Sequence, residues 1–129
     1  MTFFSFCPGK TKNLISESKC LCNLAFAQAQ LKYPKAAKNF SNALAKAHKA
    51  RNNYLQFQAC EGLGAINYHM GRYGEAVSYF KQALRILDEI RQDTEMACKR
   101  VMEKLSDAEE ALRIMKAKQR QRDFSRSNH

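Results

Sequence analysis

The feature that most constrains the fold of this chain is the stretch 63–84, which reads L-G-A-I-N-Y-H-M-G-R-Y-G-E-A-V-S-Y-F-K-Q-A-L. Its small and large apolar residues recur at spacings of three and four, which predicts two helices that each bury one stripe. Gly71 falls between the two periodic runs, where a helix end often needs a residue that tolerates the left-handed conformation. The stretch therefore predicts a helix hairpin with a tight turn.

The same pattern occurs forty residues earlier in the chain. Self-similarity at a fixed period is typical of proteins that stack one helix hairpin on the next. Leu24 stands where Gly64 stands in the second copy, so we expect the first helix pair to approach less closely. Seven positions are identical in the two copies: Cys20 and Cys60, Ala25 and Ala65, Tyr33 and Tyr73, Ala36 and Ala76, Phe40 and Phe80, Ala43 and Ala83, and Leu44 and Leu84.

This pattern resembles that of the tetratricopeptide repeat family, which combines a bulky residue, Leu-Gly, Tyr, Ala-x3-Phe and a final small residue. Two positions depart from the family, because Cys60 stands where it favours a large aromatic residue and Asn67 where it favours Tyr. The resemblance implies an all-α fold, a right-handed α-α superhelix of helix hairpins with a C-terminal capping helix. In the second copy the pattern positions are occupied by Cys60, Leu63, Gly64, Tyr73, Ala76, Phe80, Ala83 and Leu84.

The chain divides into three predicted parts. Residues 1–10 lack a helical period and are expected to form an irregular leader. Residues 11–115 are expected to form the tetratricopeptide-like domain, with repeats at about 17–53 and 57–92 and a capping helix at about 94–115. Residues 116–129 carry no apolar stripe and are expected to fray into a basic, flexible tail.

Separate runs of apolar residues define the helices. The predicted helices span about 11–31, 34–51, 54–70 and 73–91. The first is defined by Leu14, Ile15, Leu21, Leu24, Phe26 and Ala27. The capping helix, with Asp93 as its expected N-cap, has the apolar stripe Ala97, Val101, Leu105, Ala108, Leu112 and Met115. Such a stripe needs a partner surface, for which the exposed side of the second repeat is the simplest candidate.

Charge is distributed unevenly along the chain. The net charge of +10 divides into +8 for residues 1–53, −3 for 54–112 and +5 for 113–129. The lysines at 35, 38, 46 and 49 fall on one side of the second helix and form a basic stripe. Such a stripe is usually a solvated surface, although it also suits an anionic partner.

The sequence contains none of the common catalytic or metal-binding patterns. It has no Gly-rich phosphate loop, no nucleophile elbow, no H-E-x-x-H and no paired C-x2-C spacing. Cys20 and Cys60, at equivalent repeat positions, are expected to be buried and reduced. We therefore expect no catalysis, no metal and no cofactor. No run approaches a membrane span or a secretory signal, so we expect a cytoplasmic protein, with the nucleus as an alternative.

The resemblance also implies a binding site, because members of the family commonly hold ligands in the concave groove lined by the first helix of each repeat. Family members that bind the C-terminal carboxylate of chaperones use Lys and Asn where this chain has Leu21, Ala25 and Glu61. We therefore do not expect that partner. The corresponding groove positions are Ser18, Leu21, Ala25, Gln28 and Ala29 in the first repeat, and Gln58, Glu61, Ala65, Tyr68 and His69 in the second.

Two functions of different classes follow from these patterns. The first is a protein-protein interaction scaffold that binds a partner peptide or helix in the groove, centred on Glu61, Tyr68 and His69. The second is an electrostatic binder of nucleic acid or an acidic surface, through the lysine stripe and the basic tail. Only Phe124 places an aromatic ring among the tail's basic residues, and this weakens the second hypothesis.

Overall fold

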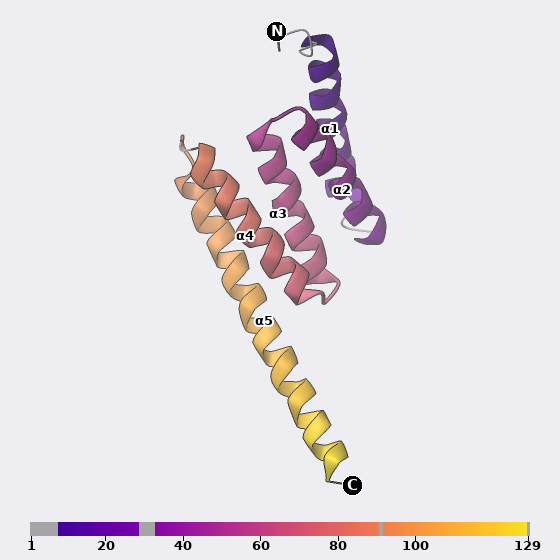
Figure 1. Cartoon of the computed structure of the whole chain (residues 1–129), viewed down its shortest axis with the longest axis vertical. Helices are drawn as coiled ribbons and strands as arrows, with labels where there is room; N and C mark the ends of the chain where they lie inside the picture. Colours follow the sequence, from indigo (N-terminus) through magenta and orange to yellow (C-terminus); the bar gives the residue numbers. More distant parts are fainter. Residues whose placement is uncertain (1–7, 29–32, 91, 129) are drawn as a thin grey trace, which may run out of the picture.

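The computed structural model describes residues 8–28, 33–90 and 92–128 (Figure 1). Within these ranges the chain is all-α and contains no strand, which confirms the predicted fold class. The helices are α1 (Pro8–Gln28), α2 (Tyr33–Lys49), α3 (Asn53–His69), α4 (Tyr73–Ile90) and α5 (Glu95–Ser127).

Each helix packs against the next one in the sequence. Helices α1 and α2 form the first hairpin and α3 and α4 the second, and α5 follows along α4 (Figure 1). Helix α3 also contacts α1 across the array, and α5 contacts α3 in the same way. Helix α3 packs on the two helices of the first hairpin, and α5 packs in the same way on the two helices of the second. Helix α5 therefore takes the place that the first helix of a further repeat would have.

The core consists of two clusters that share α3. One joins α3 to α1 and α2 around Phe40, and the other joins α3 to α4 and α5 around Phe80. The two phenylalanines occupy equivalent repeat positions and are both buried. Ala36 and Ala76 are fully buried as well, as the close helix crossings of the repeat pattern require. The shared helix makes the two hairpins one packed unit.

Two glycines allow these phenylalanine rings to touch the backbone of α3. A Cβ atom at Gly64 would lie 2.5 Å from Cε1 of Phe80, and one at Gly62 would overlap the ring of Phe40. Both rings are almost inaccessible to solvent, so they cannot swing away easily. Glycine is therefore required at both positions for α3 to pack between the hairpins.

Helix α1 packs differently from the sequence prediction. Leu24 and Phe26 are about half exposed, at 48% and 51%, and Cys20 is exposed, whereas Cys22 is buried. The prediction that Cys20 is buried like Cys60 is therefore wrong. A side chain the size of leucine at position 24 cannot approach the Phe40 ring as Gly64 approaches Phe80. The helix instead turns Ser18, Cys22 and Ala25 toward α2 and α3.

Helix α5 is longer than predicted. The tail expected to fray at residue 116 remains helical to Ser127, well beyond the rest of the molecule (Figure 1). Residues 116–127 contain no Gly or Pro and are rich in Lys, Arg and Gln, which are good helix formers even without an apolar stripe. All side chains of 113–127 are exposed, and we call this segment the arm.

The predicted stripe of α5 is correct for the part that packs on the body. Val101 and Ala108 are buried, Leu105 packs against the same cluster, and Leu112 is half-buried. Asp93 does not cap the helix as predicted. It adopts a positive φ of 48° in the turn, and Thr94 is the N-cap residue, without a side-chain hydrogen bond.

At its other end the chain is helical from Pro8, so residues 8–10 of the predicted leader belong to α1. Residues 1–7 of that leader lie outside the described residues, as do Ala29 and the predicted helix end at Leu31.

Two tight turns join α2 to α3 and α3 to α4. At the end of α3, Gly71 has a φ of 79°, and the backbone N–H of Arg72 donates to the carbonyl of Asn67 at 2.8 Å. The end of α2 repeats this geometry with Arg51, whose φ is 53°. Asn52 then caps α3 by accepting a hydrogen bond from the Leu55 N–H at 3.0 Å.

The glycines at 71 and 74 allow a matched test of the second turn. A Cβ atom at either position would meet no other atom within 4 Å, but only Gly71 has a positive φ. We expect Gly71→Ala to lower the free energy of unfolding by about 1 kcal/mol or more. Gly74→Ala lies inside α4, so it should be neutral or stabilise by up to about 1 kcal/mol. Urea denaturation measures both; equal losses would show that the turn does not depend on a left-handed residue.

Candidate functional site

The candidate site lies on the one side of α3 that neighbouring helices do not cover completely. Most of α3 is buried between the two hairpins. The predicted groove residues of this helix lie at spacings of three and four and form its partly open face. These residues are Gln58, Glu61, Ala65, Tyr68 and the exposed His69. We call this surface the inner face.

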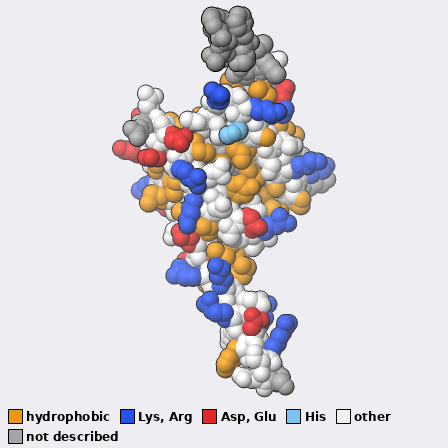
Figure 2. Space-filling view, viewed as in Figure 1, with side chains coloured by type: hydrophobic (Ala, Val, Ile, Leu, Met, Phe, Trp, Pro, Cys, Tyr) orange, Lys and Arg blue, Asp and Glu red, His pale blue; other side chains and the backbone are white. Residues whose placement is uncertain are grey.

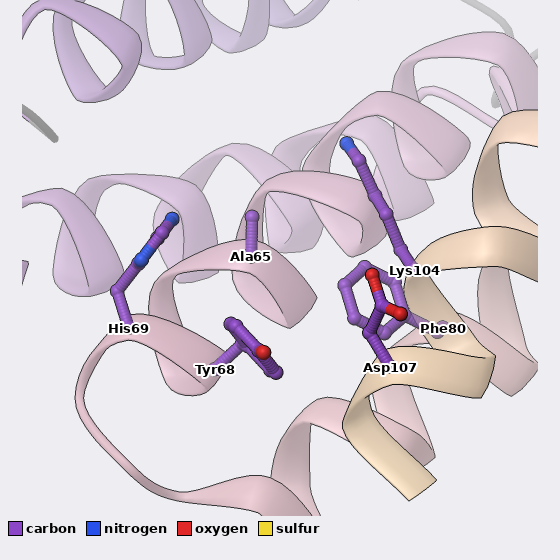
Figure 3. Close-up of a pocket in the computed structure, with 6 residues that line it drawn as sticks. All are labelled: Ala65, Tyr68, His69, Phe80, Lys104 and Asp107. Carbon is purple, nitrogen blue, oxygen red and sulfur yellow. The ribbon is translucent and has the colours of Figure 1, made fainter. Parts of the chain in front are cut away.

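One pocket opens between the inner face and α5. It has a volume of about 170 Å³ and is lined by Ala65, Tyr68, His69, Phe80, Lys104 and Asp107. Figure 3 shows the α3 residues on one side and Lys104 and Asp107, from α5, on the other. The α3 and α4 residues supply most of its apolar surface, while α5 places one cation and one carboxylate at its edge. The pocket can accept an apolar side chain and hydrogen-bond the groups next to it.

A second pocket adjoins the first on the other side of α3. Its volume is about 340 Å³, and it is lined by Phe26, Tyr33, Phe40, Gly62, Ala65, Ile66 and His69. Because Ala65 and His69 line both pockets, the two form a continuous groove that crosses α3 from the first hairpin to α5. The buried Phe40 ring packs on Gly62 at the bottom of this groove. Phe26, Ile66 and Ala65 add further apolar lining.

Aromatic rings line the groove in a row. The rings of Tyr33 and His69 are stacked, with centroids 5.8 Å apart and an angle of 11° between their planes. Tyr68 meets His69 edge to face at 5.8 Å and Tyr73 at 5.5 Å. These contacts connect the start of α2 to the start of α4 through the end of α3. They hold Tyr68 and His69 in place before any ligand binds.

Glu61 is bound within the chain and is not free for a partner. Arg100 donates from Nε and Nη2 to its two carboxylate oxygens at 2.7 and 2.9 Å, and Lys104 donates from Nζ at 3.0 Å. The Glu61 side chain is only 12% exposed, against 50% for Arg100 and 39% for Lys104. Because α5 covers Glu61, we do not retain it among the binding residues proposed below. Its role is to hold α5 beside the groove.

The same contacts shift the ionisation of Glu61. Burial alone would raise the pKa of this carboxyl group, but the hydrogen bonds and charges of Arg100 and Lys104 outweigh burial and hold the pKa below its usual value. The ionised form is thus the one that the fold favours.

The predicted groove residues of α1 are less accessible to a partner than those of α3. Ala25 is fully buried and cannot contact a partner, so that prediction is wrong. Ser18 is also fully buried and donates a hydrogen bond to the carbonyl of Ala43 at 2.9 Å. Leu21 is half-buried against the first core cluster. The Gln28 side chain lies outside the described side chains.

Sequence reasoning missed several residues of the groove. Phe26 and Tyr33 line the second pocket, and Lys104 and Asp107 line the first. The α5 pair could have been found from the spacing of Arg100, Lys104 and Asp107, which places them on one face beside the apolar stripe. Helix α5 was predicted only as a cap, so its polar face was not considered.

The described residues outside the groove provide little reactive chemistry. Burial raises the pKa of the Cys60 thiol to about 11 and also raises that of Cys22, which disfavours both thiolates. Among the described residues, no group of three or more His, Cys, Asp or Glu side chains is arranged to hold a metal ion. None of the helices in the described part of the chain combines the length and apolar character needed to cross a membrane.

The predicted lysine stripe is present on α2 but is partly neutralised. Lys35, Lys38 and Lys49 are exposed. Lys46 is half-buried and forms an ion pair with Glu17 at 2.6 Å. Counting only the described residues, three of the four lysines in the stripe have no ion-pair partner.

One known family model matches the second hairpin of the chain. Residues 57–89 match the family model described as Tetratricopeptide repeat, and this range covers most of α3 and α4. The match supports the tetratricopeptide repeat family as the origin of the hairpin pattern. Neither curated proteins nor solved structures give a match to the chain.

The Glu61 contacts predict a pH-dependent contribution to stability. Because the folded pKa lies below the ordinary value of about 4.3, the contacts stabilise the fold fully above that pH and lose their effect as pH falls through the folded pKa. Glu61→Gln should lower the free energy of unfolding by roughly 1 kcal/mol at neutral pH, and the difference from the wild type should disappear as the pH falls below the folded pKa of Glu61.

Urea denaturation across this pH range measures the effect. Glu103→Gln on the exposed side of α5 removes the same charge and should leave stability unchanged. An equal loss for both variants, or a Glu61→Gln effect independent of pH, would contradict the role of these contacts.

Proposed function

We propose that this chain is a non-catalytic protein-protein interaction module that binds a peptide or helix of a partner protein across the inner face of α3. Tetratricopeptide repeats generally mediate protein-protein interaction, and residues 57–89 match that family. The single observation that carries the proposal is the continuous groove formed by the two pockets around Ala65 and His69.

The groove supports a particular kind of ligand. Two pockets with apolar floors suit two apolar anchor side chains, one beside Phe40 and one beside Tyr68. Lys104 and Asp107 at one edge can hydrogen-bond the polar groups of the ligand and set its direction. Because His69 and Tyr68 are already held by ring contacts, little ordering cost is expected on binding.

The binding residues that we propose are fewer than those predicted from the sequence. Ala65, Tyr68 and His69 line the pockets and are retained. Gln58 is partly exposed on the same face, although its side-chain amide lies 3.4 Å from the Tyr54 hydroxyl. Phe26 and Tyr33 are added from the first hairpin. We place this function in the cytoplasm or nucleus, without cofactor or metal.

A longer array is a further part of the proposal. The segments N-L-A-F-A-Q-A-Q-L at 23–31 and Q-A-C-E-G-L-G-A at 58–65 resemble the final repeats of tetratricopeptide repeat protein 24. The position of α5, where a further repeat would begin, agrees with a chain built on that plan.

A selection experiment tests the groove. Peptides selected from a displayed library on the wild-type protein are measured by calorimetry against the wild type, Tyr68→Ala and Ala65→Arg. We expect Tyr68→Ala to weaken binding by more than about 1 kcal/mol and Ala65→Arg to abolish it, because a long charged side chain would then stand at the position that both pockets share. Affinity should persist at high salt, since the anchors are apolar.

The control is Met102→Ala, which removes an exposed side chain of α5 that lines neither groove pocket. Thermal unfolding of each variant establishes that it remains folded. Peptides that lose affinity for Met102→Ala but bind Ala65→Arg normally would contradict the proposed site.

A further inference from the structure

The arm, residues 113–127 of α5, is a surface that the groove does not use. It projects from the body as a single helix and carries six cations against one carboxylate, Asp123. Figure 2 shows the basic side chains spread along this projection. Among the described residues, none of the six cations has an ion-pair partner. The arm therefore presents its full positive charge to solvent.

The cations fall on two opposite flanks of the helix. At 100° per residue, Arg113, Lys116 and Arg120 lie on one flank and Lys118, Arg122 and Arg126 on the other, with roughly 150° between the two groups. On the second flank, a shallow hollow is lined by Lys118, Gln121, Arg122, Ser125 and Arg126. Its three cations recur every four residues, a rise of about 6 Å. Its amide and hydroxyl can also donate hydrogen bonds to phosphate oxygens.

We infer that the arm binds double-stranded DNA, with the helix in the major groove and its two basic flanks on the two phosphate backbones. The major groove is about 12 Å wide and admits an α-helix. A helix in that groove has a phosphate chain on each side, which matches cations on opposite flanks. The arm projects beyond the other described helices (Figure 1), so none of them blocks this approach, and Asp123 is the arm's single carboxylate.

Other anionic partners fit these residues less well. An anionic membrane needs a broad apolar face between the cations, but the large exposed apolar residues of the arm are Ile114 and Met115 at its start and Phe124 nine positions after Met115. Single-stranded nucleic acid is bound largely by aromatic stacking, for which Phe124 is the arm's only aromatic ring. The major groove of duplex RNA is too narrow for side chains to enter.

Fluorescence polarisation of a labelled duplex DNA of about 20 base pairs tests the inference on the full chain. The triple variant Lys118→Gln, Arg122→Gln, Arg126→Gln should bind at least about tenfold more weakly at low salt. The slope of log affinity against log salt should fall by about 3 as three phosphate contacts are lost. The matched control, Lys35→Gln, Lys38→Gln, Lys49→Gln on α2, removes the same charge and should change the slope by less than about 1.

A second variant separates helix geometry from charge. Gln119→Pro keeps every cation but breaks the arm helix, which circular dichroism can verify, and we expect it to weaken duplex binding severalfold. Equal losses for the two triple variants would overturn the inference by showing that net charge alone drives binding. Unchanged affinity of Gln119→Pro would also overturn it, as would tighter binding to phosphatidylserine vesicles, duplex RNA or single-stranded RNA than to duplex DNA.

Discussion

The contact between two phenylalanine rings and the backbone of α3 is the interaction on which the rest of the structure depends. Phe40 reaches α3 at Gly62 from the first hairpin, and Phe80 reaches it at Gly64 from the second. Because each ring touches backbone rather than a side chain, the hairpins lie close enough to bury Ala36, Ala43, Ala76 and Ala83 completely. A single helix thus forms the common wall of both core clusters.

This packing also explains the groove. Phe40, packed on Gly62, lies at the bottom of one pocket, and Phe80 lies beside Ala65 in the lining of the other. Helix α5 completes the second side, held there by its apolar stripe and by Arg100 and Lys104 on Glu61. The binding surface is therefore a consequence of repeat packing together with the helix that follows. Its residues lie on helices, so the groove is largely formed before a partner arrives.

The periodicity of the repeats predicts most of the fold but fewer of the residues that form the candidate site. The helix hairpins, the buried alanines and the stripe of α5 could be read from spacing, because each depends on local sequence. The exposure of individual residues on α1 could not be predicted in this way, because Leu24 changes which side of that helix faces its neighbours. The contacts of Glu61 could not be predicted either, because its partners lie 39 and 43 positions further along the chain, on α5. The helical arm differs from the predicted flexible tail because helix propensity alone favours a helix there, even without an apolar stripe.

The most direct test of this account is the sign of the stability change in Gly62→Ala and Gly64→Ala, measured by equilibrium urea denaturation. An alanine replacing glycine inside an ordinary helix stabilises it by up to about 1 kcal/mol. If the rings of Phe40 and Phe80 rest on the α3 backbone, each added methyl group must overpack the core and destabilise the protein by roughly 1 to 3 kcal/mol, within one cooperative transition. Stabilisation by either substitution would contradict the central role of α3.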